Sequence, residues 1–410
     1  MKRIFISLFF FAFMWTAAGA DASPELLFVR WPANPDAVWY SFRIVPVTQH
    51  FGRKEMRPPI YEDGHVFRDS VMIEKEITDS YDGPGILCCQ VKAIGLDGQS
   101  ISAYSAPVPM EKAAQEMERY APKIRVKYHE QNGTVLLYPA YSFVKIPHAV
   151  SYEVEITDEE PENPDGCEPS VHRISQGIVT IPELFDELPR QGTVWWRVRG
   201  LDEDGGPVGV WSEAEKIVND PAENWETGIL GDSISHGGGR MSYSPADWPY
   251  NYAYYLDFPT INMSRSGDKT EDLLRRFDAD VLPFHVQYLL IMGGTNNLRS
   301  GETAEEVIAD LEALQEKCRS GGIEPVLLTI PPIAPERILK YYHQPTAENW
   351  KAEFDKVNGW IRTQTHIDTA APFAMYEDMP ENLAADGLHP DKEAKEKMGK
   401  IINEKFSEIR

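Results

Sequence analysis

Two different hydrophobic patterns divide the chain near residue 220. Before this point, apolar and polar residues alternate in short runs, as in Tyr152, Val154 and Ile156 against Ser151 and Glu153, and Asp-Gly or proline-rich turns separate the runs. A period of two residues is typical of strands that bury one face, and many short strands with frequent turns predict β-sandwiches. The first half of the chain is therefore expected to be all-β.

From about Trp225 the pattern changes to apolar runs of strand length that alternate with segments of helix length. Strands are predicted at residues 227–234, 260–264, 287–294 and 324–332, and helices at 250–256, 270–277, 303–318, 347–364 and 391–406. Thr303 is the expected N-cap of the helix at 303–318. Strands that alternate with helices predict a parallel sheet covered on both faces, with ligands bound beyond the carboxyl ends of its strands.

The all-β part contains one pattern twice. The segments that match at an offset of 107 residues (198 − 91) are Val91 with Val198, Asp97-Gly98 with Asp204-Gly205, and Tyr104-Ser105 with Trp211-Ser212. Residues 31–40 and 138–152 share a further pattern upstream of each copy. A repeat of this length indicates tandem domains, and both copies resemble fibronectin type III domains. The predicted domains are two sandwiches at 23–120 and 121–221, followed by a third domain at 222–410.

The first residues have the pattern of a signal peptide. Lys2 and Arg3 precede an apolar run from Ile4 to Trp15, and small residues follow up to Ala22. The run is shorter than the roughly 20 residues that cross a bilayer, and no second apolar stretch of that length occurs downstream. Residues 1–22 are therefore expected to be removed, and the mature chain to be exported and soluble, without membrane insertion.

The charge of the chain bears on its partners. The formal net charge is −24, and acidic residues are scattered rather than clustered. Such a chain repels the phosphate backbone of nucleic acids, so nucleic acid is not an expected partner. The cysteines show no spacing typical of zinc sites, and no cofactor or metal is expected.

The ends of the first three predicted strands in the third domain each carry an unusual polar or glycine feature, and a fourth such feature stands before the last predicted helix. In chain order these are Gly231-Asp232-Ser233, Ser264-Arg265-Ser266-Gly267, Gly293-Gly294-Thr295-Asn296-Asn297 and Asp386-Gly387-Leu388-His389. Any one of them has an ordinary explanation as a helix cap or a turn. Their order, at four successive loops, is not explained in that way.

These four features resemble the conserved blocks of the SGNH (GDSL-like) hydrolase superfamily. The resemblance covers about residues 225–410 and implies an α/β three-layer, flavodoxin-like domain with esterase activity. Carried over to this chain, the catalytic triad falls on Ser233, Asp386 and His389. The oxyanion hole falls on the backbone N–H groups of Ser233 and Gly267 and on the side chain of Asn296.

The residue types suit this chemistry on physical grounds. A serine hydroxyl is a weak nucleophile at neutral pH and needs a base within hydrogen-bonding reach, oriented in turn by a third group. Asp386 and His389 are three residues apart, so one turn can hold the imidazole on the carboxylate. The negative charge that develops on the substrate oxygen requires preset donors, and backbone N–H groups and an amide side chain supply them.

Three neighbouring residues are weaker candidates. His236 follows the nucleophile, Arg265 stands in the second block, and Asn297 occupies the place where the family pattern more commonly has aspartate. These three are expected to contact substrate at most. Asp232 is expected to be structural, tying down the turn that carries Ser233. Asp386 and His389 as metal ligands are the chemical rival, but no further ligand appears at a useful spacing.

The sequence predicts the substrate less well than it predicts the reaction. Exported SGNH enzymes joined to sandwich domains often resemble carbohydrate esterases, which implies an O-acetyl or other short acyl group on a small or polymeric carbohydrate. Two alternatives remain open: a lipid esterase or thioesterase, and a glycan-binding protein with a decayed hydrolase domain. Residues 241–248 and 331–343 are expected to line the pocket. Because all catalytic candidates lie in 222–410, this part alone is expected to hydrolyse a small ester.

Overall fold

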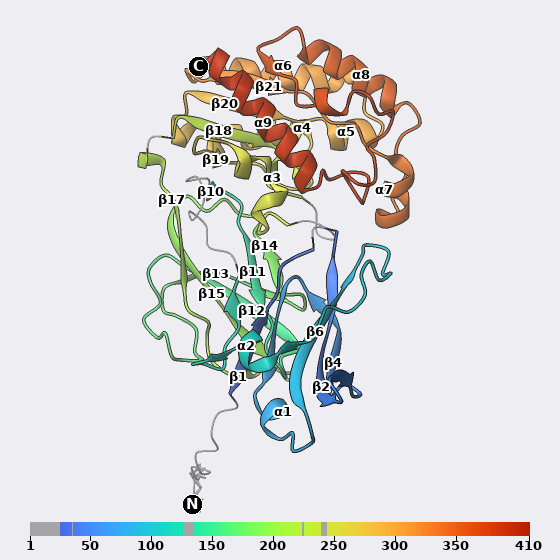
Figure 1. The fold of residues 1–410 in the computed structure, drawn as a ribbon. Helices are drawn as coiled ribbons and strands as arrows, with labels where there is room; N and C mark the ends of the chain where they lie inside the picture. Colours follow the sequence, from blue (N-terminus) through green and yellow to red (C-terminus); the bar gives the residue numbers. More distant parts are fainter. Residues whose placement is uncertain (1–24, 35, 126–134, 224, 239–243) are drawn as a thin grey trace, which may run out of the picture.

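The computed structural model describes residues 25–34, 36–125, 135–223, 225–238 and 244–410. The predicted signal peptide, residues 1–22, and residues 241–243 of one predicted pocket segment lie outside the described residues. All-β parts occupy one end of the molecule, and an α/β part with the C-terminus occupies the other (Figure 1). No helix among the described residues has the length and apolar character needed to cross a bilayer.

The first all-β part consists of two antiparallel sheets. One contains β5 (Ser70–Glu74), β1 (Leu26–Arg30) and β8 (Ala114–Met117). The other contains β3 (Arg53–Met56), β2 (Trp39–His50), β4 (Tyr61–Phe67), β6 (Ile86–Ile94) and β7 (Val108–Pro109). Short helices α1 (Glu76–Asp79) and α2 (Met110–Ala113) lie between strands. Val29 of β1 and Phe42 of β2 share one buried cluster, so the two sheets pack face to face.

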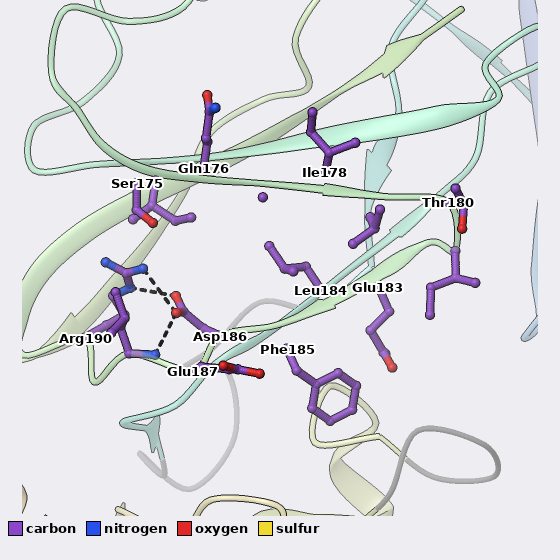
Figure 2. A pocket seen from close by; sticks show the side chains of 15 residues that line it. Ser175, Gln176, Ile178, Thr180, Glu183, Leu184, Phe185, Asp186, Glu187 and Arg190 are labelled. Atoms are coloured by element: carbon purple, nitrogen blue, oxygen red, sulfur yellow. Dashed lines mark hydrogen bonds and ion pairs between the residues drawn. The ribbon is translucent and has the colours of Figure 1, made fainter. Parts of the chain in front are cut away.

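The second all-β part repeats this arrangement. Its smaller sheet contains β14 (Glu183–Phe185), β11 (Ala140–Val144) and β9 (Lys123–Ile124). Its larger sheet contains β13 (Arg173–Val179), β12 (Ser151–Thr157), β15 (Gly192–Leu201), β16 (Pro207–Val208) and β17 (Glu215–Asn219). Along β14, Leu184 points toward β13, whereas Phe185 points away from it toward the α/β part (Figure 2). The strands agree with the predicted sandwiches, while their relation to fibronectin type III domains stays a prediction.

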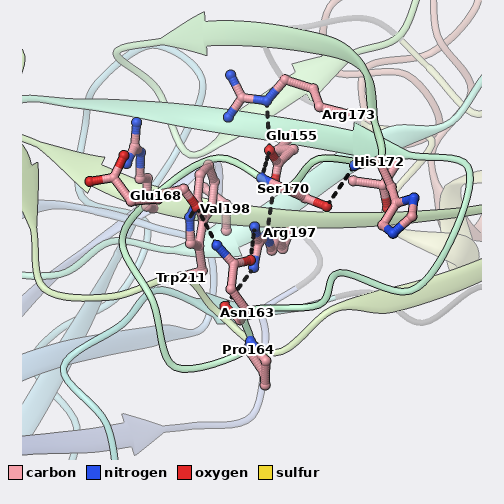
Figure 3. Close-up of polar contacts among 12 residues, drawn as sticks. Glu155, Asn163, Pro164, Glu168, Ser170, His172, Arg173, Arg197, Val198 and Trp211 are labelled. Atoms are coloured by element: carbon pink, nitrogen blue, oxygen red, sulfur yellow. Dashed lines mark hydrogen bonds and ion pairs between the residues drawn. The ribbon is translucent and has the colours of Figure 1, made fainter.

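The expectation that β12 buries only its apolar face is wrong. Glu153 and Glu155 are buried as well as Val154. Arginines neutralise them: Arg197 donates to Glu155 at 2.6 Å and Arg199 to Glu153 at 2.8 Å. Trp211 covers the two guanidinium groups, whose centres lie 4.5 and 4.6 Å from its ring centroid. Figure 3 shows how the segment around Asn163 and Ser170 closes over this polar face. The charges are tolerated because each carboxylate is paired and hydrogen-bonded.

The α/β part is built on one six-stranded parallel sheet, as predicted. Its strand order is β10 (Val135–Leu136), β19 (Ile261–Asn262), β18 (Thr227–Gly231), β20 (Tyr288–Met292), β21 (Glu324–Leu328) and β22 (His366–Ile367). Alternate residues of β20 enter two different clusters, Leu289 and Ile291 on one face and Leu290 and Met292 on the other. Both faces are therefore buried, which is typical of parallel sheets.

Helices cover both faces of this sheet. The helices are α3 (Ser233–His236), α4 (Thr270–Asp280), α5 (Thr295–Arg299), α6 (Ala304–Ser320), α7 (Pro335–Tyr342), α8 (Trp350–Ile361) and α9 (Lys392–Ile409). Phe277 of α4, Leu311 of α6 and Phe354 of α8 pack on one face, and Phe406 of α9 packs on the other. The Thr303 N-cap is confirmed, since its side chain accepts from the N–H of Glu306.

Short 3₁₀ turns complete the α/β part. They are η1 (Pro221–Glu223), η2 (Trp248–Tyr250), η3 (Tyr252–Tyr255), η4 (Leu282–Phe284) and η5 (Ala371–Phe373). The helix predicted over residues 250–256 is thus two 3₁₀ turns that meet at Asn251. The Asn251 side chain accepts from the N–H of Ala253, a local bond that competes with continuous helix.

A strand from the segment of the second all-β part belongs to the parallel sheet of the α/β part. β10 lies in the segment predicted as part of the second sandwich, yet it pairs in parallel with β19, Val135 opposite Ile261. The chain then passes through Tyr138, whose hydroxyl donates to the buried Asp280 at 2.6 Å, into β11. Arg68 of the first all-β part also pairs with Asp247 at 3.0 Å. The parallel sheet is therefore completed by residues upstream of 222.

Candidate active site

Ser233 stands at the junction between β18 and α3. The strand ends at Gly231, and Asp232 caps the helix by accepting the N–H of Ile234 at 2.9 Å. A side chain at Gly231 would place its Cβ 2.5 Å from the carbonyl oxygen of Met292, so only glycine fits beside β20. This turn directs Ser233 to the carboxyl edge of the sheet.

The predicted triad residues form one hydrogen-bonded line. The Nε2 atom of His389 lies 2.9 Å from the Oγ atom of Ser233, and its Nδ1 atom lies 2.8 Å from the Oδ2 atom of Asp386. All three residues are buried. Hydrogen positions are assigned by chemistry: because a carboxylate only accepts, Nδ1 carries the proton and Nε2 is left to face the serine.

The turn that holds Asp386 and His389 is fixed by the backbone. The Oδ1 atom of Asp386 accepts the N–H groups of Leu388 and His389, both at 2.8 Å. Gly387 has φ of +79°, and a Cβ there would come within 2.6 Å of the carbonyl oxygen of Ala334. Burial alone raises the pKa of the Asp386 carboxyl, but the neighbouring His389 and these hydrogen bonds outweigh it and lower the pKa. Asp386 is therefore ionised at neutral pH.

Tyr342 adds a contact that the sequence did not single out. Its hydroxyl donates to the Oδ2 atom of Asp386 at 2.7 Å and lies 3.2 Å from the Nδ1 atom of His389. The residue ends α7, inside the segment 331–343 that was expected to line the pocket. The sequence therefore indicated the segment that contains Tyr342 but did not indicate Tyr342 itself. A donor on this carboxylate oxygen helps to hold Asp386 in the orientation that His389 requires.

Replacing Tyr342 with phenylalanine is expected to lower kcat by about tenfold with little change in KM. A tenfold loss corresponds to about 1.4 kcal/mol in the transition state, close to the lower end of the range of about 1.5–3 kcal/mol that a hydrogen bond to a charged group contributes. Steady-state hydrolysis of p-nitrophenyl acetate measures the effect. Tyr341→Phe is the matched control, because the Tyr341 hydroxyl contacts Lys340 instead. Equal rates for both variants would contradict a role for Tyr342 at the triad.

The predicted oxyanion donors follow three adjacent strands. Ser233 follows β18, Gly267 follows β19 and Asn296 follows β20, and β18 pairs with both neighbours. Gly267 has φ of +93°, which a glycine adopts without strain. The side-chain amide of Asn296 donates one hydrogen to the carbonyl oxygen of Asp268 at 2.9 Å, which orients the group and leaves its second hydrogen for another acceptor.

Asn297 has a different place from the expected substrate contact. Its side chain is buried, and its Nδ2 atom donates to Glu302 at 2.6 Å and to Glu271 at 2.9 Å. Its Oδ1 atom accepts the N–H of Thr270 at the start of α4. The side chain therefore ties α5 to α4, which argues against substrate binding because its polar atoms are engaged inside the protein.

His236 is likewise an internal residue. Its Nε2 atom lies 2.7 Å from the carbonyl oxygen of Tyr138, which only accepts, so Nε2 carries the proton. The N–H of Ser266 then donates to Nδ1 at 3.2 Å. Burial lowers the pKa of His236 to about 4, so the ring is neutral at neutral pH. His236 therefore links the β10 segment to the Gly267 loop and is not placed to act as a base for Ser233.

Arg265 remains a candidate substrate contact. Its guanidinium is partly exposed and forms an ion pair with Asp268 at 2.7 Å.

Two buried ionisable groups, Lys395 and Asp232, lie close to the turn that carries Ser233. Lys395 of α9 is buried, donates to the carbonyl oxygen of Ile234, and has its pKa lowered to about 7 by burial. Burial raises the pKa of Asp232 to about 6. No sequence pattern distinguished Lys395 from the other lysines of this amphipathic helix.

Within the described ranges, no group of three or more His, Cys, Asp or Glu side chains is arranged to hold a metal ion. Asp386 contacts His389, and His389 contacts Ser233, an arrangement suited to proton transfer from a serine hydroxyl. With donors grouped at the ends of β18, β19 and β20, the site has the parts needed for acyl transfer.

Comparison with known proteins identifies the same region. Residues 229–397 match the model of the GDSL-like lipase/acylhydrolase family. A relative from Escherichia coli (strain K12), thioesterase 1/protease 1/lysophospholipase L1, is 29% identical over 171 residues, which cover 40% of this chain and 76% of the relative.

Solved structures similar to the chain include two with related names. A GDSL-like lipase from Bacteroides thetaiotaomicron has 16% identity and a TM-score of 0.39 and covers 46% of this chain and 91% of its own. The lipase/acylhydrolase from Enterococcus faecalis has 25% identity and a TM-score of 0.36, with coverage of 45% and 96%. On the match to the family model, the C-terminal region of the chain, at residues 229–397, is a GDSL-like lipase/acylhydrolase domain of the SGNH type.

Proposed function

We propose that the protein is a serine ester hydrolase in which Ser233 is the nucleophile, His389 the general base and Asp386 the residue that orients the base. The observation that carries the proposal is the line of contacts from Ser233 Oγ to His389 at 2.9 Å and from His389 to Asp386 at 2.8 Å. Family membership of the region supports hydrolysis of an ester or thioester by this domain.

The proposed reaction has two steps. Ser233 attacks the ester carbonyl while its proton passes to the Nε2 atom of His389, and the oxyanion that forms accepts from the N–H groups of Ser233 and Gly267 and from Asn296. His389 then gives the proton to the leaving alcohol, which leaves an acyl-enzyme on Ser233. A water molecule, deprotonated by His389, releases the acid and restores the serine.

The substrate that we propose is a short acyl ester on a carbohydrate. The supporting features are the predicted export of the chain and the all-β parts that precede the hydrolase domain, which we propose to be fibronectin-like. A second candidate, a thioesterase or lysophospholipase, is favoured by the name of the Escherichia coli relative. The net charge of −24 continues to disfavour nucleic acid as a partner.

One experiment separates these candidates. Wild-type protein is assayed with p-nitrophenyl esters of increasing chain length, with a long-chain acyl thioester, and with acetylated xylan. We expect p-nitrophenyl acetate and acetylated xylan to be hydrolysed and the rate to fall as the acyl chain lengthens. A serine-directed phosphonate is expected to label Ser233 and stop the reaction. A preference for the long-chain thioester would instead support the second candidate.

Replacement of Asn296 with alanine is expected to lower kcat by roughly 10² to 10³ with little change in KM, because the lost donor serves the oxyanion more than the bound ester. Asn297→Ala is the matched control at the adjacent position. It leaves the N–H of the buried Thr270 without its acceptor, so it is expected to lower thermal stability by about 1–3 kcal/mol and to affect kcat much less. Steady-state kinetics and thermal unfolding of both variants test this, and a reversed pattern would shift the donor to Asn297.

A further inference from the structure

A hollow of about 330 Å³ lies against the Gly267 loop, at the seam between the hydrolase domain and the second all-β part. Arg265 to Asp268 and Asp272 form the hydrolase wall, and Phe185, Asp186 and Glu187 form the opposite wall. The space beside Gly267 is open, since a Cβ built there would meet nothing within 4 Å. A ligand in this hollow therefore lies beside Gly267, whose N–H is one of the proposed oxyanion donors.

We propose that this seam hollow binds a neutral sugar unit of the carbohydrate that carries the ester. The inference rests on the proposed function and adds to it the place and the chemical class of the alcohol part of the substrate. The volume is within the range of small-ligand sites, which starts at about 300 Å³.

The charges of the hollow select against anionic ligands. Four carboxylates line it, Asp186, Glu187, Asp268 and Asp272, against the single guanidinium of Arg265. The guanidinium of Arg265 forms an ion pair with Asp268 at 2.7 Å, so its charge is partly neutralised within the protein. Arginines outside the lining pair with its aspartates as well, Arg190 with Asp186, Arg276 with Asp268 and Arg275 with Asp272. The exposed carboxylate of Glu187 is therefore the charge that an anionic ligand meets. It repels a phosphate headgroup, a uronate or a coenzyme phosphate, whereas a neutral polyol meets carboxylate acceptors for its hydroxyl groups.

The wall from the all-β part supplies both an apolar and a polar surface. Phe185 points away from β13 toward the hydrolase domain (Figure 2), and its ring lies 6.4 Å from that of His236 in an edge-on arrangement. Asp186 is held rigidly by Arg190 at 2.6 Å. The neighbouring Glu187 is exposed. An aromatic ring next to one buried and one exposed carboxylate suits a sugar, which presents C–H surfaces and hydroxyl groups together.

The test uses the full-length protein with Glu187→Trp, which fills the hollow from an exposed position, and Glu187→Gln, which removes only the charge. Glu203→Trp is the matched control, because Glu203 is exposed in a turn outside the hollow. The probes are p-nitrophenyl acetate, p-nitrophenyl octanoate, a panel of acetylated neutral oligosaccharides of xylose, glucose and mannose, and acetylated oligogalacturonides.

We expect Glu187→Trp to lower kcat/KM on the best neutral oligosaccharide by at least about tenfold and to leave p-nitrophenyl acetate unchanged. For the wild type, kcat/KM should be at least about tenfold lower on oligogalacturonides than on that oligosaccharide. Glu187→Gln should make this ratio smaller, because it removes a negative charge that repels the uronates. Unchanged oligosaccharide activity in Glu187→Trp overturns the inference, as does a loss confined to the octanoate, which would place an acyl chain in the hollow. Activity on p-nitrophenyl acetate without activity on any oligosaccharide also overturns it, whereas no hydrolysis of any ester overturns the proposed function itself.

Discussion

Ser233→Ala is expected to lower kcat for p-nitrophenyl acetate by on the order of 10⁶, which leaves activity near background. The substitution removes the Oγ atom that lies 2.9 Å from the Nε2 atom of His389, and no acyl-enzyme can form without this oxygen. The side chain is buried but small, and the backbone bonds of the turn around Asp232 are retained. Circular dichroism and thermal unfolding should therefore match those of the wild type.

Ser320→Ala provides the comparison, since Ser320 is exposed at the end of α6. It should hydrolyse the ester at the wild-type rate in the same preparation. Residual activity of Ser233→Ala above a few per cent would mean that another group is the nucleophile. The proposal for the triad would then fail even though the family assignment of the domain would stand.

The hydrolase domain could be predicted from the sequence because its signals are local. The strands before Ser233, Gly267 and Asn296 lie in short apolar runs, and these three residues closely follow them, so strand ends and chemistry are read together. Asp386 and His389 stand before the last predicted helix. Parallel strands bring their carboxyl ends to one edge. The contact between Ser233 and His389 spans 156 residues, yet it needed only the order of the motifs to be expected.

Other features depended on contacts that no local pattern reveals. The sequence predicts that the polar face of β12 is exposed, because Glu153 and Glu155 alternate with apolar residues. In the structure this face is buried, and arginines from β13 and β15 neutralise the two carboxylates. Tyr342 is one of two adjacent tyrosines in α7, and its role comes from the position of Asp386. In both cases the partner lies far along the chain.

β10 escaped prediction for a related reason. The strand has two residues, Val135 and Leu136, and precedes a segment that matches the start of the first all-β copy. The repeat assigned it to a sandwich. In the structure this segment instead supplies an edge strand to the parallel sheet before it enters β11. A two-residue strand carries too little periodicity for its partner to be deduced.

This shared strand changes the result expected for the hydrolase domain alone. A chain of residues 222–410 lacks Val135, Leu137 and Tyr138, all of which belong to the main buried cluster of the domain. It also loses the hydroxyl that donates to the buried Asp280 and the carbonyl that accepts from His236. We therefore expect this chain to be destabilised by roughly 6–15 kcal/mol, from about 1.5–3 kcal/mol for each of the three buried side chains and about 1–3 kcal/mol for each of the two unsatisfied buried groups.

A loss of this size is comparable to the whole stability of many domains, which is about 5–15 kcal/mol. Thermal unfolding and p-nitrophenyl acetate hydrolysis of residues 222–410 should show an early transition and little activity, whereas residues 121–410 should retain both. The comparison isolates β10 and its sandwich, because both chains lack Arg68 and its contact with Asp247. If 222–410 unfolds within a few degrees of 121–410 and is equally active, the β10 segment does not complete the catalytic domain. If 222–410 is folded but inactive, the link from Tyr138 through His236 to the Gly267 loop is the feature that the active site lacks.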